Sequence, residues 1–383
     1  MDKPTVQDIF HRFYPAYLDQ YSPSPVQAKV AHNIMNCKTG AYGANVCVCE
    51  DCGFVQIHYN SCRNRCCPMC QAVPKEMWMD ARREDVLDAP YFHLVFTVPD
   101  ILNPVIYSNQ RLLYDALYHA ASSTISELTA DPKHLGAKVG YICILHTWGS
   151  EMNFHPHIHT ILLGGGLASN NQWKDNGENF FLPIRVISKM FRGKYLEELK
   201  RLWEEDKLVF HGTAEKFRNH YTFKELLDSC YGMDWIPHCK KTFNGAQTVI
   251  KYLGKYTHRI AVSNHRIVRM DDGTVTFLVK DYRNEGQWKE LTISGVEFVR
   301  RFLMHVPPRR FVRIRHYGLL CSRTKSQKLT LCRNLLGCKK YLSKLRDMEM
   351  PEILEHLYGI KVCVCKACGG HLGKPQMKMP LRC

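Results

Sequence analysis

The hydrophobic and polar positions of the chain follow helical and strand-like periods in an order that predicts a mixed fold. Helical spacing of apolar residues occurs over about the first 35 positions, from about Asn103 to Leu128, around Tyr195 to Glu204 and from about Ala246 to His258. Strand-like runs lie at Tyr91–Pro99, in GYICILHTW, in FHPHIHTILL and at Trp235–Lys240. This order predicts an α+β fold in which helices pack on a largely antiparallel sheet.

Composition divides the chain into three expected regions. Residues 1–85 combine an amphipathic helix with eight cysteines and are predicted to form a helical and zinc-binding domain. Residues 86–264 hold the strands and helices of the α+β domain. Residues 265–383 are predicted to form a basic β/α region that ends in a further cysteine cluster.

Composition also narrows the class of protein. The chain is 45% hydrophobic and 23% charged, which is typical of globular proteins. No run approaches the roughly 18 apolar residues that a membrane span needs, and the N-terminus lacks the layout of a signal peptide. We therefore expect a cytoplasmic protein without a membrane partner; the sequence carries no signal for its oligomeric state.

Positive charge is concentrated in one segment. The formal net charge of the chain is +16. The segment between Phe298 and Arg346 contains fourteen Lys and Arg and no acidic residue, so it contributes +14 of this charge. Interleaved with Phe302, Phe311, His316 and Tyr317, these charges predict a surface that neutralises phosphates and stacks bases; a solvated helix face is the alternative. The predicted DNA contacts in this segment are Arg309, Arg310, Arg313 and Arg315.

The eighteen cysteines indicate metal sites, because they cluster in CxxC pairs. Cys49 and Cys52 are predicted to converge with Cys67 and Cys70 on one tetrahedral, structural zinc ion. Candidates for a second four-cysteine site are Cys37, Cys47, Cys62 and Cys66. Candidates for a C-terminal zinc site are Cys363, Cys365 and Cys368 with His371 or Cys383, and free buried thiols are the alternative there.

Two short pairs suggest chemistry. His157 and His159 share one face of a strand, and two imidazoles leave positions open for the oxygen ligands of Mg²⁺ or Mn²⁺. His155 shares that face and is either a third ligand or a neighbour. Tyr252 and Tyr256 stand four residues apart on one helical face. Taken alone, each pair also has a purely structural interpretation.

Several stretches together resemble the two-tyrosine HUH transposases of the rolling-circle insertion-sequence family ninety-one. YNSCRNRCCPMCQ (59–71) is similar to the zinc segment of that family, LHTWGSEMNFHPHIH (145–159) to its metal strand and IKYLGKYTHRIAVSN (250–264) to its tyrosine helix. VTFLVKDYR and RIRHYGLL are similar to segments further downstream. The chain departs from the family at Cys66, where His is usual, and at Cys321, where a small residue is usual.

The resemblance implies roles for these residues. His157 and His159 would bind a catalytic Mg²⁺ or Mn²⁺, with His155 or His258 as the candidate third ligand, and Tyr252 and Tyr256 would be the nucleophiles. Lys251, Lys255 and Arg259 would lie beside the DNA.

The resemblance further implies a nucleoid-associated transposase that nicks and rejoins single-stranded DNA at insertion-sequence ends and target through a 5′-phosphotyrosine intermediate. Two alternatives stay open. A replication initiator or relaxase would use the same chemistry, although the chain has no GxxxxGK[ST] phosphate loop. The second alternative is a non-enzymatic zinc protein that binds nucleic acid without cleaving it.

Overall fold

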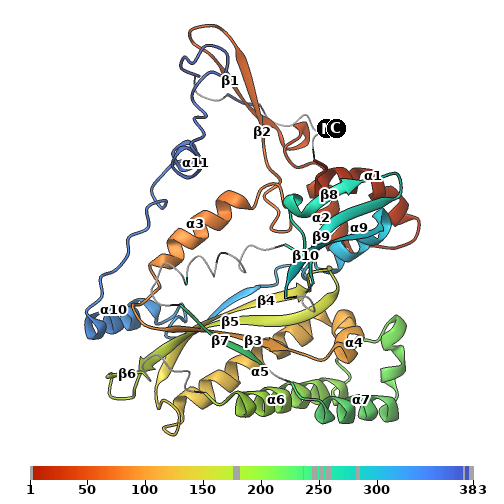
Figure 1. The fold of residues 1–383 in the computed structure, drawn as a ribbon, viewed down its shortest axis with the longest axis vertical. Coiled ribbons are helices and arrows are strands. Elements are labelled where there is room, and N and C mark those ends of the chain that lie inside the picture. The colour runs from red at the N-terminus through yellow and green to blue at the C-terminus, as the bar shows by residue number, and fades with distance from the viewer. Residues whose placement is uncertain are drawn as a thin grey trace.

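A six-stranded antiparallel sheet forms the centre of the molecule in a computed structural model, which describes residues 3–175, 182–235, 237–243, 249, 254, 260–281, 285–373 and 376–378 (Figure 1). Its strands are β3 (Tyr91–Thr97), β4 (Lys138–Trp148), β5 (Phe154–Leu167), β6 (Trp173–Asp175), β7 (His238–Phe243) and β11 (Ile314–Gly318). They are ordered β11-β4-β5-β3-β7, and β6 pairs with β5. The predicted α+β fold with a largely antiparallel sheet is confirmed.

Helices cover one face of this sheet. They are α4 (Asn103–Ser108), α5 (Gln110–Ala130), α6 (Ile184–Glu204) and α7 (His220–Gly232) (Figure 1). Alternate strand residues such as Phe92, Leu94 and Ile158 point into the core beneath them. The single helix expected from Asn103 is broken at Asn109, whose side chain donates hydrogen bonds to the carbonyls of Val105 and Val209.

The opposite face of the sheet is apolar at one end and polar at the other. Ile142, Ile144 and Ile161 pack there against Val249 and against two helices, α3 (Ala72–Arg83) and α10 (Lys325–Leu336). Residues two apart on a strand share a face, so His146 on β4 and His157 and His159 on β5 lie on the same face as these isoleucines, at the polar end. We call this whole face of the sheet the histidine face.

A second unit joins the N-terminus to residues 267–304. Helices α1 (Val6–Leu18), α2 (Pro25–Met35) and α9 (Gly295–Met304) pack on a sheet of β8 (Ile267–Met270), β9 (Thr274–Asp281) and β10 (Gln287–Ser294). Thr5 and Ser24 begin α1 and α2 with capping boxes, and Pro25 occupies a first-turn position. The rings of Phe10 and Phe302 meet edge to face, with centroids 5.2 Å apart.

The three regions expected from composition are therefore interleaved in space. Strand β11, which comes from the expected C-terminal region, pairs with β4 and completes the central sheet. Helix α9 packs on α1. Long-range pairing of this kind leaves no mark in local composition, so the expected boundaries at residues 85 and 264 do not separate packing units.

A small three-stranded sheet projects from one end of the molecule (Figure 1). It contains β1 (Ala44–Val48), β2 (Val55–Tyr59) and β12 (Gln376–Lys378), so both ends of the chain contribute to it. The chain reaches it from α10 by way of α11 (Met350–Tyr358). Among the helices of the described part of the chain, none is long and apolar enough to cross a membrane.

Candidate functional site

Three histidines meet on the histidine face. Strand β5 runs between β4 and β3, and its register places His157 opposite His146 and His159 opposite Val95. One ring nitrogen of each of His146, His157 and His159 lies within 4.8 Å of the others. The Nε2 atoms of His157 and His159 are 3.1 Å apart, and all three side chains are buried. The arrangement brings together three ligand atoms suited to one metal ion.

Neighbouring groups orient these rings. Nδ1 of His157 lies 2.7 Å from the carbonyl oxygen of His155, to which it donates when its Nε2 is the ligand atom. Nδ1 of His159 lies 2.9 Å from Nε2 of His93 on β3. The ring of His146 stacks on that of Trp148, with centroids 4.6 Å apart. Such contacts fix the tautomer and the direction of a metal ligand.

The third histidine of the group is not His155, one of the two candidates for a third ligand. His155 is outside the group, because its Nδ1 lies 3.1 Å from a carboxylate oxygen of Asp100. His146, which the sequence interpretation missed, takes its place. A polar residue near the end of the apolar strand GYICILHTW was the available signal, since the short turn before FHPHIH pairs the two histidine-bearing ends. His258, the other candidate, lies outside the described residues.

The donor set bears on the choice of metal. Within the described residues the group consists of three imidazoles, which leaves coordination positions open to water or phosphate oxygen. Imidazole nitrogen suits zinc, copper, iron and nickel, whereas magnesium and manganese prefer oxygen ligands. A divalent metal ion therefore fits this site, and oxygen ligands would have to complete the coordination of a harder ion.

The predicted nucleophiles Tyr252 and Tyr256 lie outside the described residues, as do Lys251, Lys255 and Arg259. Two positions near them are described. Val249 is buried in the apolar cluster of the histidine face, and Gly254 is buried against Sδ of Met79 on α3. Both positions therefore lie on the side of the sheet that carries the histidines.

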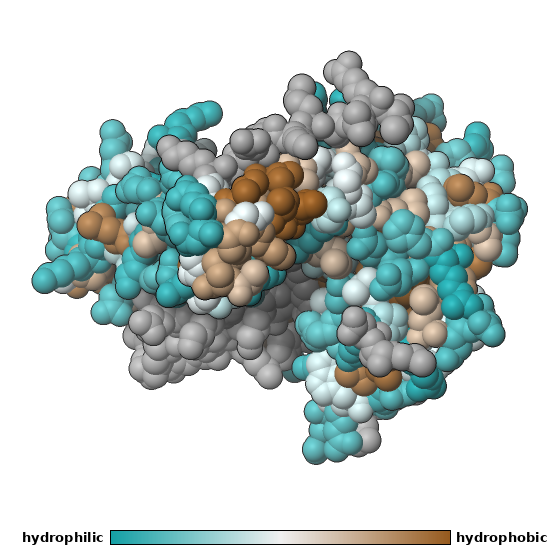
Figure 2. Space-filling view, turned by 90° about the horizontal axis from the view of Figure 1, so that it is seen from above, coloured by the Kyte–Doolittle hydropathy of each residue, from teal (hydrophilic) through white to brown (hydrophobic). Residues whose placement is uncertain are grey.

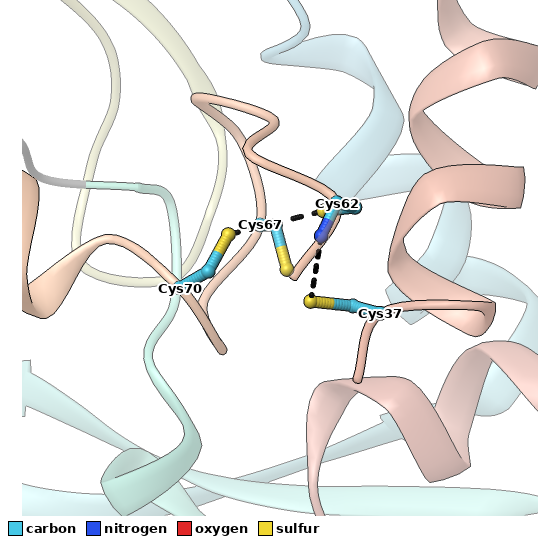
Figure 3. A group of neighbouring side chains, drawn as sticks. All are labelled: Cys37, Cys62, Cys67 and Cys70. Atoms are coloured by element: carbon cyan, nitrogen blue, oxygen red, sulfur yellow. Dashed lines mark hydrogen bonds between the residues drawn. The ribbon is translucent and has the colours of Figure 1, made fainter. Parts of the chain in front are cut away.

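Four cysteines form a first thiol cluster (Figure 3): Cys37, Cys62, Cys67 and Cys70. The Sγ atoms of Cys62 and Cys70 are 3.8 Å apart. A zinc ion with Zn–S bonds of about 2.3 Å places tetrahedral sulfurs about 3.8 Å apart, and a disulfide would need about 2 Å. Hydrogen bonds from the neighbouring thiols of Cys62 and Cys67 lower the pKa of Cys70, which favours a thiolate there. The cluster fits structural zinc.

The expected grouping of the cysteines is corrected. Cys67 and Cys70 do not share a site with Cys49 and Cys52, because the latter lie at the turn of the projecting β1–β2 hairpin. Cys49 and Cys52 instead face Cys365 and Cys368 from the other end of the chain.

Other cysteines proposed as ligands stand apart. Among the described residues, Cys47 and Cys66 are buried outside both thiol clusters, and Cys363 is exposed. His371 bonds to Asp51 through its backbone N–H, and its side chain joins neither cluster. Cys383 lies outside the described residues.

The basic segment only partly forms the predicted surface. Arg309 and Arg310 are exposed and line one depression together with Lys29 and Arg65. Arg313 is half-buried. Arg315 forms an ion pair with Asp115, so part of its charge is neutralised within the chain.

The aromatic residues predicted to stack on bases do not line that surface. Phe302 and Phe311 are 3% and 2% exposed, so the prediction that they stack on bases is wrong. His316 is half-buried, and desolvation lowers its pKa to about 4. Tyr317 stacks on Tyr141, with ring centroids 5.2 Å apart. The aromatic spacing in this segment reflects packing.

Comparison with known proteins gives two family matches. A family described as "Putative transposase" matches residues 140–328, and a family described as "Transposase zinc-binding domain" matches residues 9–98.

Two curated proteins are similar over most of the chain. "Putative transposase y4qJ" of Sinorhizobium fredii is 40% identical over 369 residues, which are 95% of this chain and 93% of that protein. "Transposase for insertion sequence element IS801" of Pseudomonas savastanoi pv. phaseolicola is 30% identical over 309 residues, which are 79% of this chain and 72% of that protein.

Two solved structures of the conjugative relaxase TrwC in complex with OriT DNA match more weakly. The metal-free structure is 15% identical, covers 45% of this chain and 68% of its own, and has a TM-score of 0.23. The copper-bound structure is 13% identical, covers 67% of this chain and 99% of its own, and has a TM-score of 0.26. At these TM-scores the likeness carries no argument about fold or activity.

Proposed function

This chain belongs to the transposases of insertion-sequence family ninety-one, and we propose that it nicks and rejoins single-stranded DNA at insertion-sequence ends with Tyr252 and Tyr256 as nucleophiles. One observation carries the proposal. The group His146, His157 and His159 lies on the same face of the sheet as Val249 and Gly254. In the sequence, Tyr252 lies three residues after Val249 and Tyr256 lies two residues after Gly254.

The histidines would serve by holding a divalent ion. That ion, when bound, withdraws charge from the oxygens of the scissile phosphate. His146, His157 and His159 would supply nitrogen ligands, and the contacts of His93 and of the His155 carbonyl would hold two of the rings in their ligating tautomer. Because all three imidazoles are buried and packed against neighbours, little reorganisation would be needed to bind the ion.

The tyrosines would carry out the covalent step. The phenolic oxygen of one tyrosine attacks phosphorus, and a phosphotyrosine bond to the 5′ side forms as the bond to the 3′ oxygen breaks. The phenol proton ends, through solvent, on the departing 3′ oxygen, which becomes a hydroxyl. Attack by a 3′-hydroxyl on the phosphotyrosine reverses the step, so rejoining consumes no ATP. A second tyrosine would permit paired cleavage and strand transfer.

Positive side chains would assist this step and hold the DNA. A tyrosine has an ordinary pKa of about 10, so its phenolate needs nearby positive charge at neutral pH. Lys251, Lys255 and Arg259 are proposed for that role. The depression lined by Lys29, Arg65, Arg309 and Arg310 lies beside the zinc-binding segment and is proposed to contact the phosphates of an element end. Family membership favours transposition over replication initiation or conjugation as the outcome.

A covalent-adduct assay tests the proposal. The protein is incubated with single-stranded oligonucleotides of the element ends and with Mg²⁺ or Mn²⁺, and the adduct is separated on a denaturing gel. We expect a DNA–protein adduct that is lost in the Tyr252→Phe, Tyr256→Phe double variant. His146→Ala and His157→Ala should also abolish the adduct while DNA binding persists.

His155→Ala is the matched control, because His155 faces Asp100 outside the ligand group. We expect this variant to keep most of its activity. Equal adduct yields in the His146→Ala variant and the unmodified chain would reject the metal assignment. DNA binding without any adduct under all metals would instead support the non-enzymatic alternative.

A further inference from the structure

Two turns of the same design lie near opposite ends of the chain. Cys49 and Cys52 are followed by Gly53, and Cys365 and Cys368 are followed by Gly369. In each turn the glycine N–H donates to the carbonyl of the first cysteine at 3.0 Å, and the glycine has a positive φ, of 72° and 78°. Such a conformation favours glycine, so the C-x-x-C-G pattern specifies both turns.

The two turns face each other through their sulfur atoms. The Sγ atoms of Cys49 and Cys368 are 3.5 Å apart, and those of Cys52 and Cys365 are 3.8 Å apart. All four lie within 4.8 Å of one another. These separations fit the edge of about 3.8 Å expected of four thiolates around zinc, and they exceed the length of a disulfide. Backbone N–H groups of Ala367 and Gly370 point at sulfur, at 3.4 Å each, as suits thiolates.

We propose that Cys49, Cys52, Cys365 and Cys368 form a second structural zinc site, a discontinuous ribbon that clasps the two ends of the chain together. The surrounding backbone supports the clasp. The N–H of Glu50 donates to the carbonyl of His371 at 3.1 Å, and the N–H of Gly373 donates to the carbonyl of Val48 at 2.9 Å. Strand β12 then adds to the edge of β1.

Among the residues that the structure describes, the apolar contacts at the clasp are few. The buried cluster there consists of Cys47, Cys49, Cys365 and Leu372. Two of these four residues are themselves ligands in the proposed site. A segment with so small a core depends on a metal for much of its folding free energy. Removing the zinc should therefore release the C-terminal end from the hairpin.

The clasp also anchors a strap, which we define as residues 337–349. This strap leaves α10 and runs past the C-terminal end of α3 toward α11 and the hairpin (Figure 1). Asp80 of α3 is buried and accepts hydrogen bonds from the side chains of Tyr341 and Ser343, at 2.6 Å each, and from the N–H of Leu345 at 2.9 Å. Because α3 begins at Ala72, two residues after Cys70, it connects the first thiol cluster to Met79 on the histidine face.

Zinc stoichiometry of the full-length protein tests the clasp. We expect the double variant Cys365→Ser, Cys368→Ser to contain one zinc ion fewer per chain than the unmodified protein, as measured by elemental analysis. Cys363→Ser is the matched control, since Cys363 precedes this turn and is exposed outside the thiol cluster; its zinc content should be unchanged. Unchanged zinc in the double variant, or an equal loss in the control, would overturn the proposal.

Cysteine labelling of the unmodified protein tests the clasp even if the double variant fails to fold. Cys363 and Cys368 are both exposed, so both should react with an alkylating reagent unless one of them is bound to metal. We expect mass spectrometry to find Cys363 labelled and Cys368 protected in the zinc-loaded protein. Chelation should make Cys368 reactive and should speed proteolysis of the strap. Equal labelling of the two cysteines before chelation would contradict the clasp.

Discussion

Nε2 of His93 on β3 lies 2.9 Å from Nδ1 of His159 on β5, and both rings are buried. When His159 binds a metal through Nε2, its Nδ1 carries a proton and donates a hydrogen bond to His93. His93 must then accept at Nε2 and keep its own proton on Nδ1. A residue that accepts a hydrogen bond from a metal-binding histidine raises the basicity of that ligand and holds its ring in place.

The His93→Ala variant should therefore weaken metal binding without removing a ligand. We expect a loss of about 10–100-fold in Mn²⁺ affinity by calorimetry, because partners of metal-binding histidines have effects of that size. His93→Gln should restore most of the affinity, since its amide oxygen accepts the same hydrogen bond. A merely structural role for His93 would predict equal losses in both variants, accompanied by lowered thermal stability.

Gly254 tests the link between α3 and the tyrosine segment. A methyl group at this position would meet Sδ of Met79, so the Met79 side chain must shift in the Gly254→Ala variant. We expect adduct formation to fall on the order of 100-fold, because small displacements near a reacting group are costly in rate. The Met79→Ala, Gly254→Ala double variant should recover much of the loss, which a double-mutant cycle would measure.

Gly193 offers a control for the change in backbone propensity. It lies in α6, and a methyl group there would meet no atom within 4 Å. Gly193→Ala should leave adduct formation unchanged and raise stability by roughly 0.5–1 kcal/mol. A similar loss of activity in both variants would show that the contact with Met79 has no special role.

Local periodicity predicted much of the fold and two of the three histidines in the group. The strands containing His146, His157 and His159 were recognisable from alternation and from the short turn between them. The position of His146 beside the other two histidines could not be predicted in the same way. It depends on the cross-strand register and on a bulge in the β4–β5 pairing. The zinc sites show the same limit.

Proximity in sequence misled the pairing of the cysteines. Spacing along the chain predicts that Cys49 and Cys52 pair with the next CxxC, whereas their neighbours in the structure come from the far end of the chain. The glycine that follows Cys52 and Cys368, but not Cys70, was the one local sign of the true pairing. In the basic segment, Phe302 and Phe311 were misassigned because an aromatic residue between arginines has the same pattern in a core and on a DNA-binding surface.

Arg309 and Arg310 should contribute to DNA affinity mainly through charge. Both are exposed at the depression that also contains Lys29 and Arg65. For the Arg309→Ala, Arg310→Ala variant we expect weaker binding of single-stranded DNA. The slope of log affinity against log salt should shrink by about 1.4, because each phosphate contact contributes about 0.7. Lys200→Ala, which removes an exposed charge on α6, should leave the slope unchanged; equal slopes in the two variants would refute the assignment.

His305 should make stability depend on pH. Its ring is buried, with Nδ1 3.1 Å from the hydroxyl of Thr147 and Nε2 3.0 Å from the carbonyl oxygen of Met152, so it braces the turn between β4 and β5. Desolvation by burial lowers its pKa to about 4. The unfolded chain has a histidine pKa of about 6.5, so between these values the unfolded state binds more protons.

Stability should therefore be full above about pH 6.5 and should fall as the pH drops toward 4, by on the order of 3 kcal/mol for this group. Urea unfolding at a series of pH values would measure the slope. His305→Gln keeps a hydrogen-bonding side chain but cannot titrate, so the fall should be smaller in that variant, with the part due to His316 remaining because its pKa is also lowered to about 4. If the two proteins lost stability in parallel between pH 6.5 and 4, His305 would not be the group that couples protonation to unfolding.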